Sequence, residues 1–475
     1  MKTSPLYWRL SVITLGILSL SGCATVDMSK SVQQTNQQLA PFTQGELVLH
    51  QDLESPNFQQ NFADELLKSP LNQSKAVSLL LNYSPEFQSL LAQNWSQQSM
   101  AAQIGRIHNP AFSFERVSNA HEIEIGQVLS FGLLDLLTLP ARQEAAKWQL
   151  KQRQAELAVK VVTQISQLRN AWIDAVVAQE KWQYAKKVMT AAEATATLAK
   201  RMQAAGNFTR SQSLRQQLFY SDAAVTLAKR QHEWLSKKEQ LVRLLGLTAK
   251  QAKQLKLPSQ LSDLPDSPLS VESVKNLGAN RLDIQMAQIQ LDSLLSTYGI
   301  EKVTSFTDIE VGLIKESKED RESGDKENSD GFEIEIQLPI FDWGELKRQS
   351  AKAKLLQAQT QLLTTQRQAS SYLRESYSAY RTAYDIANHY QNEVVPMQEI
   401  LAEENTYQYN GMFISVFQLI ADSKQQISAI ESAIDAKADF WKAKTNLDAN
   451  LIGQPITSIL TQINSNSANN ASDAH

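Results

Sequence analysis

The most regular pattern in the chain is an apolar seam with heptad spacing. Between residues 161 and 189, mostly apolar side chains recur at alternate steps of four and three residues, which predicts a helix packed against a neighbour as in a coiled coil. A second seam consists of Ala369, Tyr372, Ser376, Ala379, Ala383, Ile386 and Tyr390. The two seams predict helices over 141–204 and 344–409, each of about 65 residues and roughly 100 Å. Pro396 is expected to bend the second helix rather than end it.

Two shorter segments alternate between apolar and polar residues with a period of two. Residues 121–131 and 332–341 place isoleucine, leucine and phenylalanine on one face, and Glu122, Glu124, Glu333 and Glu335 on the other. Such alternation over about ten residues is typical of a transmembrane barrel strand, and an edge sheet packed on soluble helices is the alternative. Partner strands are predicted over 111–117 and 303–314. The charged segment 315–331 is expected to be a mobile surface loop of open function.

The chain repeats itself at an offset near 205 residues. Gly206, Asn207 and Phe208 correspond to Gly411, Met412 and Phe413, an offset of 205. Trp234 and Gly246 likewise correspond to Trp441 and Gly453, at an offset of 207. The repeat predicts a mainly α-helical fold with a small β part, in which each half reads helix, strand, strand, long helix, long helix. The remaining helices are expected over 74–104, 210–246, 270–299 and 414–452, and the two repeats over 74–262 and 263–453.

Four strands per chain cannot close a barrel. Open strand edges are not tolerated in lipid, where bacterial barrels have at least eight strands. Two copies would give eight strands filled by side chains, whereas three copies give twelve and can leave a lumen. If the apolar face meets lipid, the four glutamates line an acidic pore.

The N-terminus has the features of an exported lipoprotein. Lys2 and Arg9 flank an apolar run from Leu10 to Leu20, and Leu20-Ser21-Gly22-Cys23 resembles the bacterial lipobox, in which the cysteine is acylated. A secretory peptide that happens to contain a cysteine is the alternative. We expect a signal peptide over 1–22, a lipidated extended tether over 23–73 and a disordered tail over 454–475.

Charge and composition exclude several classes of function. Removing residues 1–22 deletes two positive charges and changes the net charge from −4 to −6, which makes nucleic acid an unexpected partner. The six histidines are widely spaced, and no zinc signature, phosphate loop or nucleophile elbow is present. The sequence therefore predicts no enzyme, no metal site and no cofactor.

Several short motifs, together with the duplication, resemble the outer-membrane factor family, the TolC-like exit ducts of tripartite efflux pumps and type I secretion systems. The motifs are Asn109-Pro110, Asn280-Arg281-Leu282-Asp283-Ile284, Leu338-Pro339-Ile340-Phe341-Asp342-Trp343-Gly344 and Tyr409-Asn410-Gly411. The resemblance implies a homotrimer with a twelve-stranded β-barrel in the outer membrane, continued by a twelve-helix α-barrel in the periplasm. It also implies a periplasmic adaptor protein and an inner-membrane pump as partners, and outer-membrane lipids around the barrel.

The resemblance further places the helical tips at the two breaks, residues 204–211 and 408–415, where glycine would permit the turn. Phe208, Met412 and Phe413 are expected to contact the adaptor or to pack between protomers. Several relatives have acidic residues after the second break, but this chain has Phe417 and Gln418 there, which favours an apolar constriction through Phe413 or Phe417. The alternative to a duct is a periplasmic coiled-coil lipoprotein that forms no pore.

Overall fold

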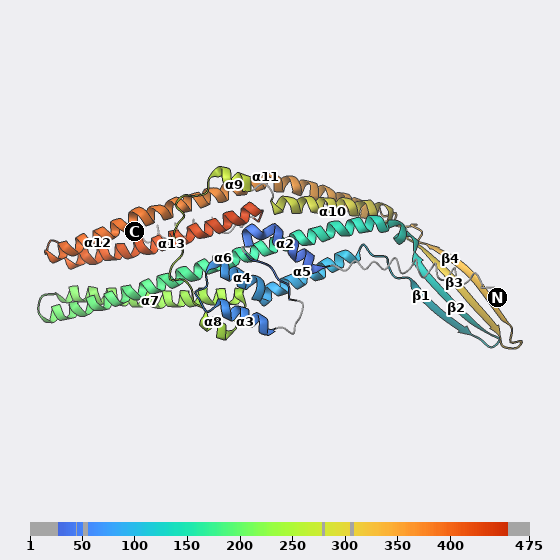
Figure 1. The fold of residues 1–475 in the computed structure, drawn as a ribbon, viewed down its shortest axis with the longest axis horizontal. Helices are drawn as coiled ribbons and strands as arrows, with labels where there is room; N and C mark the ends of the chain where they lie inside the picture. Colours follow the sequence, from blue (N-terminus) through green and yellow to red (C-terminus); the bar gives the residue numbers. More distant parts are fainter. Residues whose placement is uncertain (1–26, 44, 51–55, 278–280, 305–307, 455–475) are drawn as a thin grey trace. The chain divides into compact units, whose positions relative to one another are not determined.

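The computed structural model describes residues 27–43, 45–50, 56–277, 281–304 and 308–454 (Figure 1). The signal peptide, Cys23 and the tail beyond residue 454 lie outside these ranges, so the predictions about them stay predictions. The chain forms two compact units. The sheet unit contains Gln93–Gln154 and Ile289–Gln359, and the helical unit contains Val32–Ala92, Ala155–Gln288 and the residues from Thr360 onward.

The sheet unit contains four antiparallel strands in the order β1-β2-β3-β4. They are β1 (Ala111–Ser118), β2 (Glu122–Gly132), β3 (Ile309–Asp320) and β4 (Lys326–Ile336). Each strand pairs with the next one along the chain, so β1 and β4 are the two edges.

Two predictions about the second strand pair are wrong. The charged segment 315–331 is not a loop: β3 runs to Asp320, β4 begins at Lys326, and only the five residues between them turn. Its charges are compatible with strands because they pair across them, as Lys326 does with Glu319 at 3.1 Å. β4 ends at Ile336 rather than 341, since Pro339 has no N–H to donate to a strand ladder.

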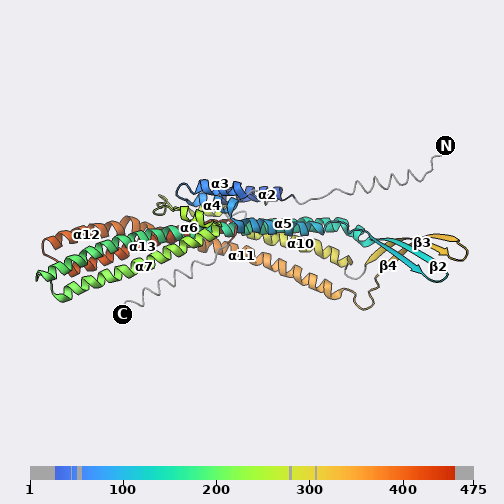
Figure 2. The ribbon, with the colours of Figure 1, turned by 90° about the horizontal axis from the view of Figure 1, so that it is seen from below.

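The helical unit is built around the long helices, which Figures 1 and 2 show lying alongside one another. The first half supplies α7 (Arg210–Leu245) and, from Ala155 onward, α6 (Leu133–Ala204). The second half supplies α12 (Val395–Asn410), α13 (Val416–Ile452) and, from Thr360 onward, α11 (Glu345–His389). In both views α7 and α12 lie on the outer sides, with α6 and α13 between them.

The second long helix is interrupted at Pro396 without ending there. Residues Tyr390–Val394 form a π-helical segment, in which the N–H of Val395 donates to the carbonyl of Tyr390, five residues back. Pro396 has no N–H for the carbonyl of Asn392, and a π segment accommodates this loss in the adjoining turn.

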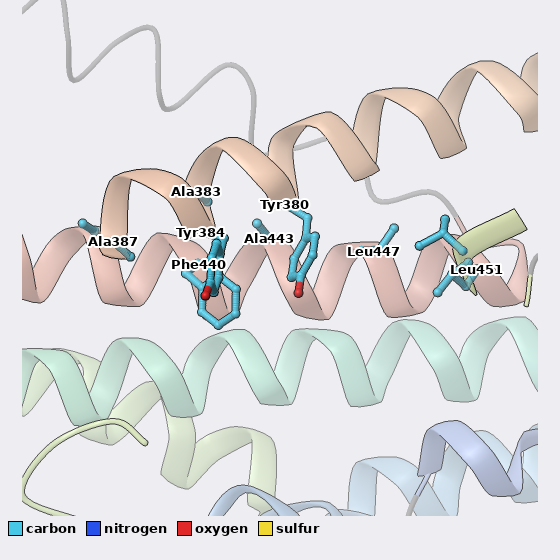
Figure 3. Packing of buried hydrophobic residues seen from close by; sticks show 10 residues of the cluster. Tyr380, Ala383, Tyr384, Ala387, Phe440, Ala443, Leu447 and Leu451 are labelled. Carbon is cyan, nitrogen blue, oxygen red and sulfur yellow. The ribbon is translucent and has the colours of Figure 1, made fainter. Parts of the chain in front are cut away.

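The first seam is buried as predicted from Val161 to Ala175, and in the second seam Ile386 alone is exposed. Val161, Ile165 and Leu168 are fully buried. In α11 the predicted seam residues Ala369 and Ala383 are buried, and so are Tyr380, Tyr384 and Ala387, which the prediction did not include. The predicted register treated Ile386 as core, but the tyrosines pack on α13 through Phe440, whose ring centroid lies 5.6 Å from that of Tyr380 (Figure 3).

The remaining helices differ from the prediction mainly at their ends. Residues 74–104 form two helices, α4 (Gln73–Tyr83) and α5 (Pro85–Gln103), because Ser84 precedes a proline and is extended. The helix expected over 270–299 is instead α9 (Val271–Leu277) and α10 (Leu282–Thr304), and a short α8 (Ala249–Gln254) follows α7. The helix α6 begins at Leu133 rather than at 141, and it includes Pro140.

The tether predicted over 23–73 is not extended where it is described. It contains α2 (Met28–Thr43) and α3 (Pro56–Leu66). Leu39 and Phe42 are buried, and Arg169 of α6 donates to the carbonyl of Phe42 at 2.6 Å. Apolar burial and this hydrogen bond fix α2 on the long helix, which the polar composition of the segment concealed.

Candidate functional site

One face of the sheet is apolar over its half nearest the helices, and the opposite face is acidic. Phe112, Leu129, Leu313 and Phe332 stand side by side across all four strands in the observed register. They are 64, 41, 54 and 73% exposed. Each such row of paired residues is a rung of the sheet. The next two rungs on this face, toward the helices, consist of Phe131, Val311 and Ile334 and of Ile309 and Ile336. An exposed apolar band of this extent marks a surface that contacts lipid or another protein.

The opposite face carries the predicted glutamates. Residues that pair across antiparallel strands share a face, so the register places nine acids there with one base, Lys318. The acids are Glu115, Glu122, Glu124, Glu310, Glu316, Asp320, Glu327, Glu333 and Glu335. Lys318 pairs with Glu124 at 2.6 Å. The sequence thus identified four of these acids correctly as lying on one face. It missed Glu316, Asp320 and Glu327 because their segment was expected to be a loop, and it did not single out Glu115 and Glu310 in the predicted partner strands.

The first tip is a helix end closed by glycine. Gly206 has φ +78° and no atom near the position of a Cβ. The N–H of Asn207 donates to the carbonyl of Met202 and that of Gly206 to Gln203, which is the Schellman pattern. Thr209 then caps α7 through a reciprocal hydrogen-bonded pair with Gln212.

The second tip has the same backbone pattern on different residues. Here the N–H of Phe413 donates to the carbonyl of Gln408 and that of Met412 to Tyr409, and Ser415 caps α13. The left-handed residue is therefore Met412, at φ 62°, whereas Gly411 has φ −78°. Matching the hydrogen bonds gives an offset of 206, so the sequence correspondence of Gly206 with Gly411 is wrong by one residue. Gly411 has another role: a Cβ there would lie 2.7 Å from the ring of Phe413.

The apolar side chains of the two tips differ in exposure. Met412 is 92% and Phe413 85% exposed, whereas Phe208 is half-buried. Phe208 lines a cavity together with Tyr409 and Val416, so the two tips adjoin within the helical unit. The backbone of Phe417 belongs to α13, and its side chain lies outside the described part of the structure.

Partly buried charges join the first half of the helical unit to the second. Asp174 of α6 accepts from Lys237 of α7 at 2.8 Å and from Lys442 of α13 at 2.5 Å. Lys181 pairs with Asp435 at 2.5 Å, and Arg230 with Glu431 at 2.9 Å. Asp174 thus ties three helices together, a role that its isolated place in an apolar stretch could have suggested from the sequence.

These partly buried charges form a charged layer around Asp174. Within it, the pKa values of two carboxyl groups are shifted in opposite directions. Burial raises the pKa of Asp174, but Lys442 and Lys237 outweigh it and hold that pKa below the usual value. Burial is the main reason that the pKa of Asp439 is raised, and Asp435 adds to the effect while Lys442 opposes it. The charge of Lys442 lowers the pKa of both carboxyl groups, so the layer is sensitive to charge at either position.

The family motif at the start of the second repeat has a structural role. Arg281 is buried, and its guanidinium donates to the carbonyl of Asn450 at 2.7 Å and to Asp283 at 2.7 Å. It therefore satisfies a carbonyl at the C-terminus of α13, which ends at Gly453 in a left-handed conformation. Ser84 does the same in the first half by donating to the carbonyl of Leu244 at 3.1 Å.

Side chains that could hold a metal ion do not converge in the described ranges. Those residues include no set of three histidine, cysteine or acidic side chains arranged to hold a metal ion. His108 contacts Asp135, which also pairs with Arg142 at 3.4 Å, and Arg142 donates to the carbonyl of Arg106. This exposed cluster fastens the segment before β1 to the start of α6. None of the described helices is long and apolar enough to cross a membrane.

Comparison with known proteins gives the class to which this fold corresponds. Residues 274–411 match the family model of outer membrane efflux proteins. The chain is similar in structure to the outer membrane protein VceC of Vibrio cholerae, with 17% identity and a TM-score of 0.63 over 84% of this chain and 99% of that one. It is also similar to the CmeC outer membrane channel of Campylobacter jejuni, with 15% identity and a TM-score of 0.64 over 86% of this chain and 89% of that one.

A membrane protein from Pseudomonas aeruginosa is similar at 16% identity and a TM-score of 0.67, over 80% of this chain and 93% of that one. No curated protein matches the chain. At these identities the structural likeness establishes the fold. The resemblance indicated by the sequence is confirmed: residues 274–411 match the outer membrane efflux protein model, and the mainly helical fold with a small antiparallel sheet is that of the VceC and CmeC structures.

Proposed function

We propose that this protein is a passive outer-membrane duct, the exit channel of a tripartite efflux or type I secretion system. The observation that carries the proposal is the sheet, with two open edges, an exposed apolar face and an acidic opposite face. Open edges are excluded from lipid, so β1 of one copy must pair with β4 of another. Three copies give a twelve-stranded barrel, the smallest closed assembly of this chain with room for a lumen.

In such a homotrimer the apolar rungs face outer-membrane lipid, and Glu122, Glu124, Glu333 and Glu335 face the lumen with the other acids. The long helices extend the lumen as a twelve-helix tunnel in the periplasm. Energy comes from an inner-membrane pump through a periplasmic adaptor. The chain is anchored through acylated Cys23, and a pore needs no cofactor and no catalytic group.

The exposed second tip is where we propose that the adaptor docks. Met412 and Phe413 present apolar surface that no described residue covers appreciably, and Gly206 and Asn207 lie at the first tip beside the half-buried Phe208. Clustered exposed apolar side chains at a turn suit a partner surface better than solvent. Gly411 supports this surface by leaving space for the Phe413 ring. Phe413 and Phe417 remain the proposed constriction.

Cysteine pairs at the strand edges test the assembly. Phe114→Cys on β1 combined with Asn328→Cys or Asp330→Cys on β4 should yield covalent dimers and trimers, and no larger species, after oxidation in outer membranes. As a control, Ile125→Cys with Ser317→Cys joins directly opposed residues of one chain and should give crosslinked monomers only. If the edge pairs also gave monomers alone, the barrel and with it the duct would be ruled out, leaving a tether that forms no pore.

A further inference from the structure

A cavity in the helical unit lies between the first and the second half near the tips. Its volume is about 350 Å³. Its walls come from α6, α7, α12 and α13 and from Phe208, and they are mainly aliphatic and aromatic. The larger side chains are Met202, Phe208, Phe219, Leu419, Ile420 and Ile427. The volume and the apolar walls fall within the range of small-molecule sites.

One polar side chain in this wall has no partner. Gln216 of α7 is 2% exposed and lines the cavity, and neither its amide nitrogen nor its amide oxygen is hydrogen-bonded to any described residue. Its neighbour Gln217 donates to Ser213 at 3.2 Å, so a nearby hydroxyl group is already engaged. A buried amide without partners is costly, which makes a ligand that pairs with it favourable.

The remaining lining residues define the charge of the ligand. Among the residues described around the cavity, Lys187 is the only charged one, and it is exposed. A smaller cavity of about 140 Å³ shares Val188, Phe219 and Ile427 with the first and holds charges of both signs, including Asp222, Glu431 and Lys424. The larger cavity therefore suits an uncharged molecule.

We infer that this cavity binds a neutral, largely apolar small molecule with an adjacent hydrogen-bond donor and acceptor, such as a secondary amide, which pairs with the Gln216 side chain. The apolar body of the ligand fills the space between Phe208, Phe219 and Leu419. Because both halves contribute walls, the bound ligand holds α6 and α7 against α13. The inference requires only the described helical unit and does not depend on the chain forming a pore.

The probe is 4-fluorobenzanilide, a neutral amide, and its binding is followed by fluorine NMR with the full chain in lipid nanodiscs and with empty nanodiscs as the baseline. Gln216→Met keeps the length of the side chain and removes the amide, and should weaken binding about 3- to 10-fold, the contribution of one or two hydrogen bonds. Gln231→Met, an exposed position on the same helix, should leave binding unchanged. The amide-free 4-fluorostilbene should bind wild type and Gln216→Met equally well.

A second variant tests the place of binding. Ala199→Phe adds a ring at the buried wall residue Ala199 and should abolish saturable binding of both compounds. The amide should raise the thermal midpoint of the wild type and not that of Ala199→Phe, because a ligand that binds only the folded state stabilises it. No saturable binding to the wild type, as expected for a cavity that holds water, would overturn the inference, and so would equal binding to Ala199→Phe. Neither result would bear on crosslinking at the strand edges.

Discussion

The two tips have the same hydrogen-bond pattern but place different residues in the left-handed conformation. At the first, Gly206 adopts it without a side chain to strain the backbone; at the second, Met412 adopts it and keeps its side chain almost wholly exposed. A non-glycine residue in this conformation costs about 1 kcal/mol or more. The second tip therefore stores strain that the first lacks. The long helix leading to it also contains the π-helical segment at Tyr390–Val394.

The difference shows that the backbone motif of the duplication is retained while its residues have shifted by one position. It also identifies the second half as the less stable arm, since local strain and an interrupted hydrogen-bond ladder lower the free energy of local opening. In a duct that opens by movement of its tips, the second half would move first.

The largest effect is expected from removing the charge that ties the halves together. Asp174→Asn leaves Lys237 and Lys442 without their shared carboxylate and should lower the free energy of unfolding by about 2 kcal/mol. Thermal unfolding followed by circular dichroism at fixed protein concentration measures it. Asp263→Asn is the matched control, because Asp263 pairs with Lys437 on the exposed surface, and its midpoint should not change. Equal effects of both variants would mean that the ion pairs of Asp174 do not stabilise the contacts between the helices.

At the first tip, Gly206→Ala should cost about 1 kcal/mol, since alanine is strained at a φ of +78°. The expected readout is roughly fivefold faster hydrogen exchange at the amide of Asn207. Gly299→Ala is the control: Gly299 lies within α10 with open space around it, so alanine should stabilise that helix slightly. Unchanged exchange at Asn207 would mean that alanine is not strained in the left-handed conformation at this position.

At the second tip the expected change in stability has the opposite sign. Met412→Gly relieves the strain but increases the freedom of the unfolded chain, so a net gain of about 0.5 kcal/mol is expected. The amide of Phe413 should exchange about twofold more slowly. Faster exchange in Met412→Gly, the direction expected for Gly206→Ala at the first tip, would contradict the difference in strain between the two tips.

The smallest effect concerns pH and the charged layer. Because the folded-state pKa of Asp439 is raised, acidification toward its ordinary value near 4 should first increase stability. Because that of Asp174 is lowered, further acidification through its folded-state value should then remove the stability that Asp174 supplies. Asp439→Asn should abolish the first change and keep the second, as measured by the thermal midpoint across this range. A profile identical to that of the wild type would exclude Asp439 as the source.

The sequence predicted the parts of the fold that depend on repeated patterns. The heptad seam at Val161, Ile165 and Leu168 identified a buried face, and strand alternation placed Glu122 and Glu333 on one face of the sheet. The prediction of the buried face failed where the contacts of single residues, rather than a repeated pattern, determine it. In α11, tyrosines that pack on Phe440 set a register that apolarity alone did not indicate.

The site was harder to predict because its features depend on contacts between distant residues. Gly206 and Gly411 look equivalent in the sequence, and only the hydrogen bonds reveal that Met412 occupies the matching position. The charged segment 315–331 contains parts of β3 and β4. Predicting these strands would have required knowing that Lys326 pairs with Glu319 and Lys318 with Glu124. The unpartnered amide of Gln216 had no signal in the sequence at all.

Single-channel recording in planar lipid bilayers tests the central claim most directly. The purified, crosslink-verified oligomer should give discrete conductance steps, and a salt gradient should give a reversal potential that indicates preference for cations over anions, since nine acids and one lysine per chain line the proposed lumen. Replacing Glu122, Glu124, Glu333 and Glu335 with glutamine should reduce that preference, and Phe417→Ala should raise the conductance if the constriction lies there. An oligomer that inserts into the bilayer and passes no current would contradict the account.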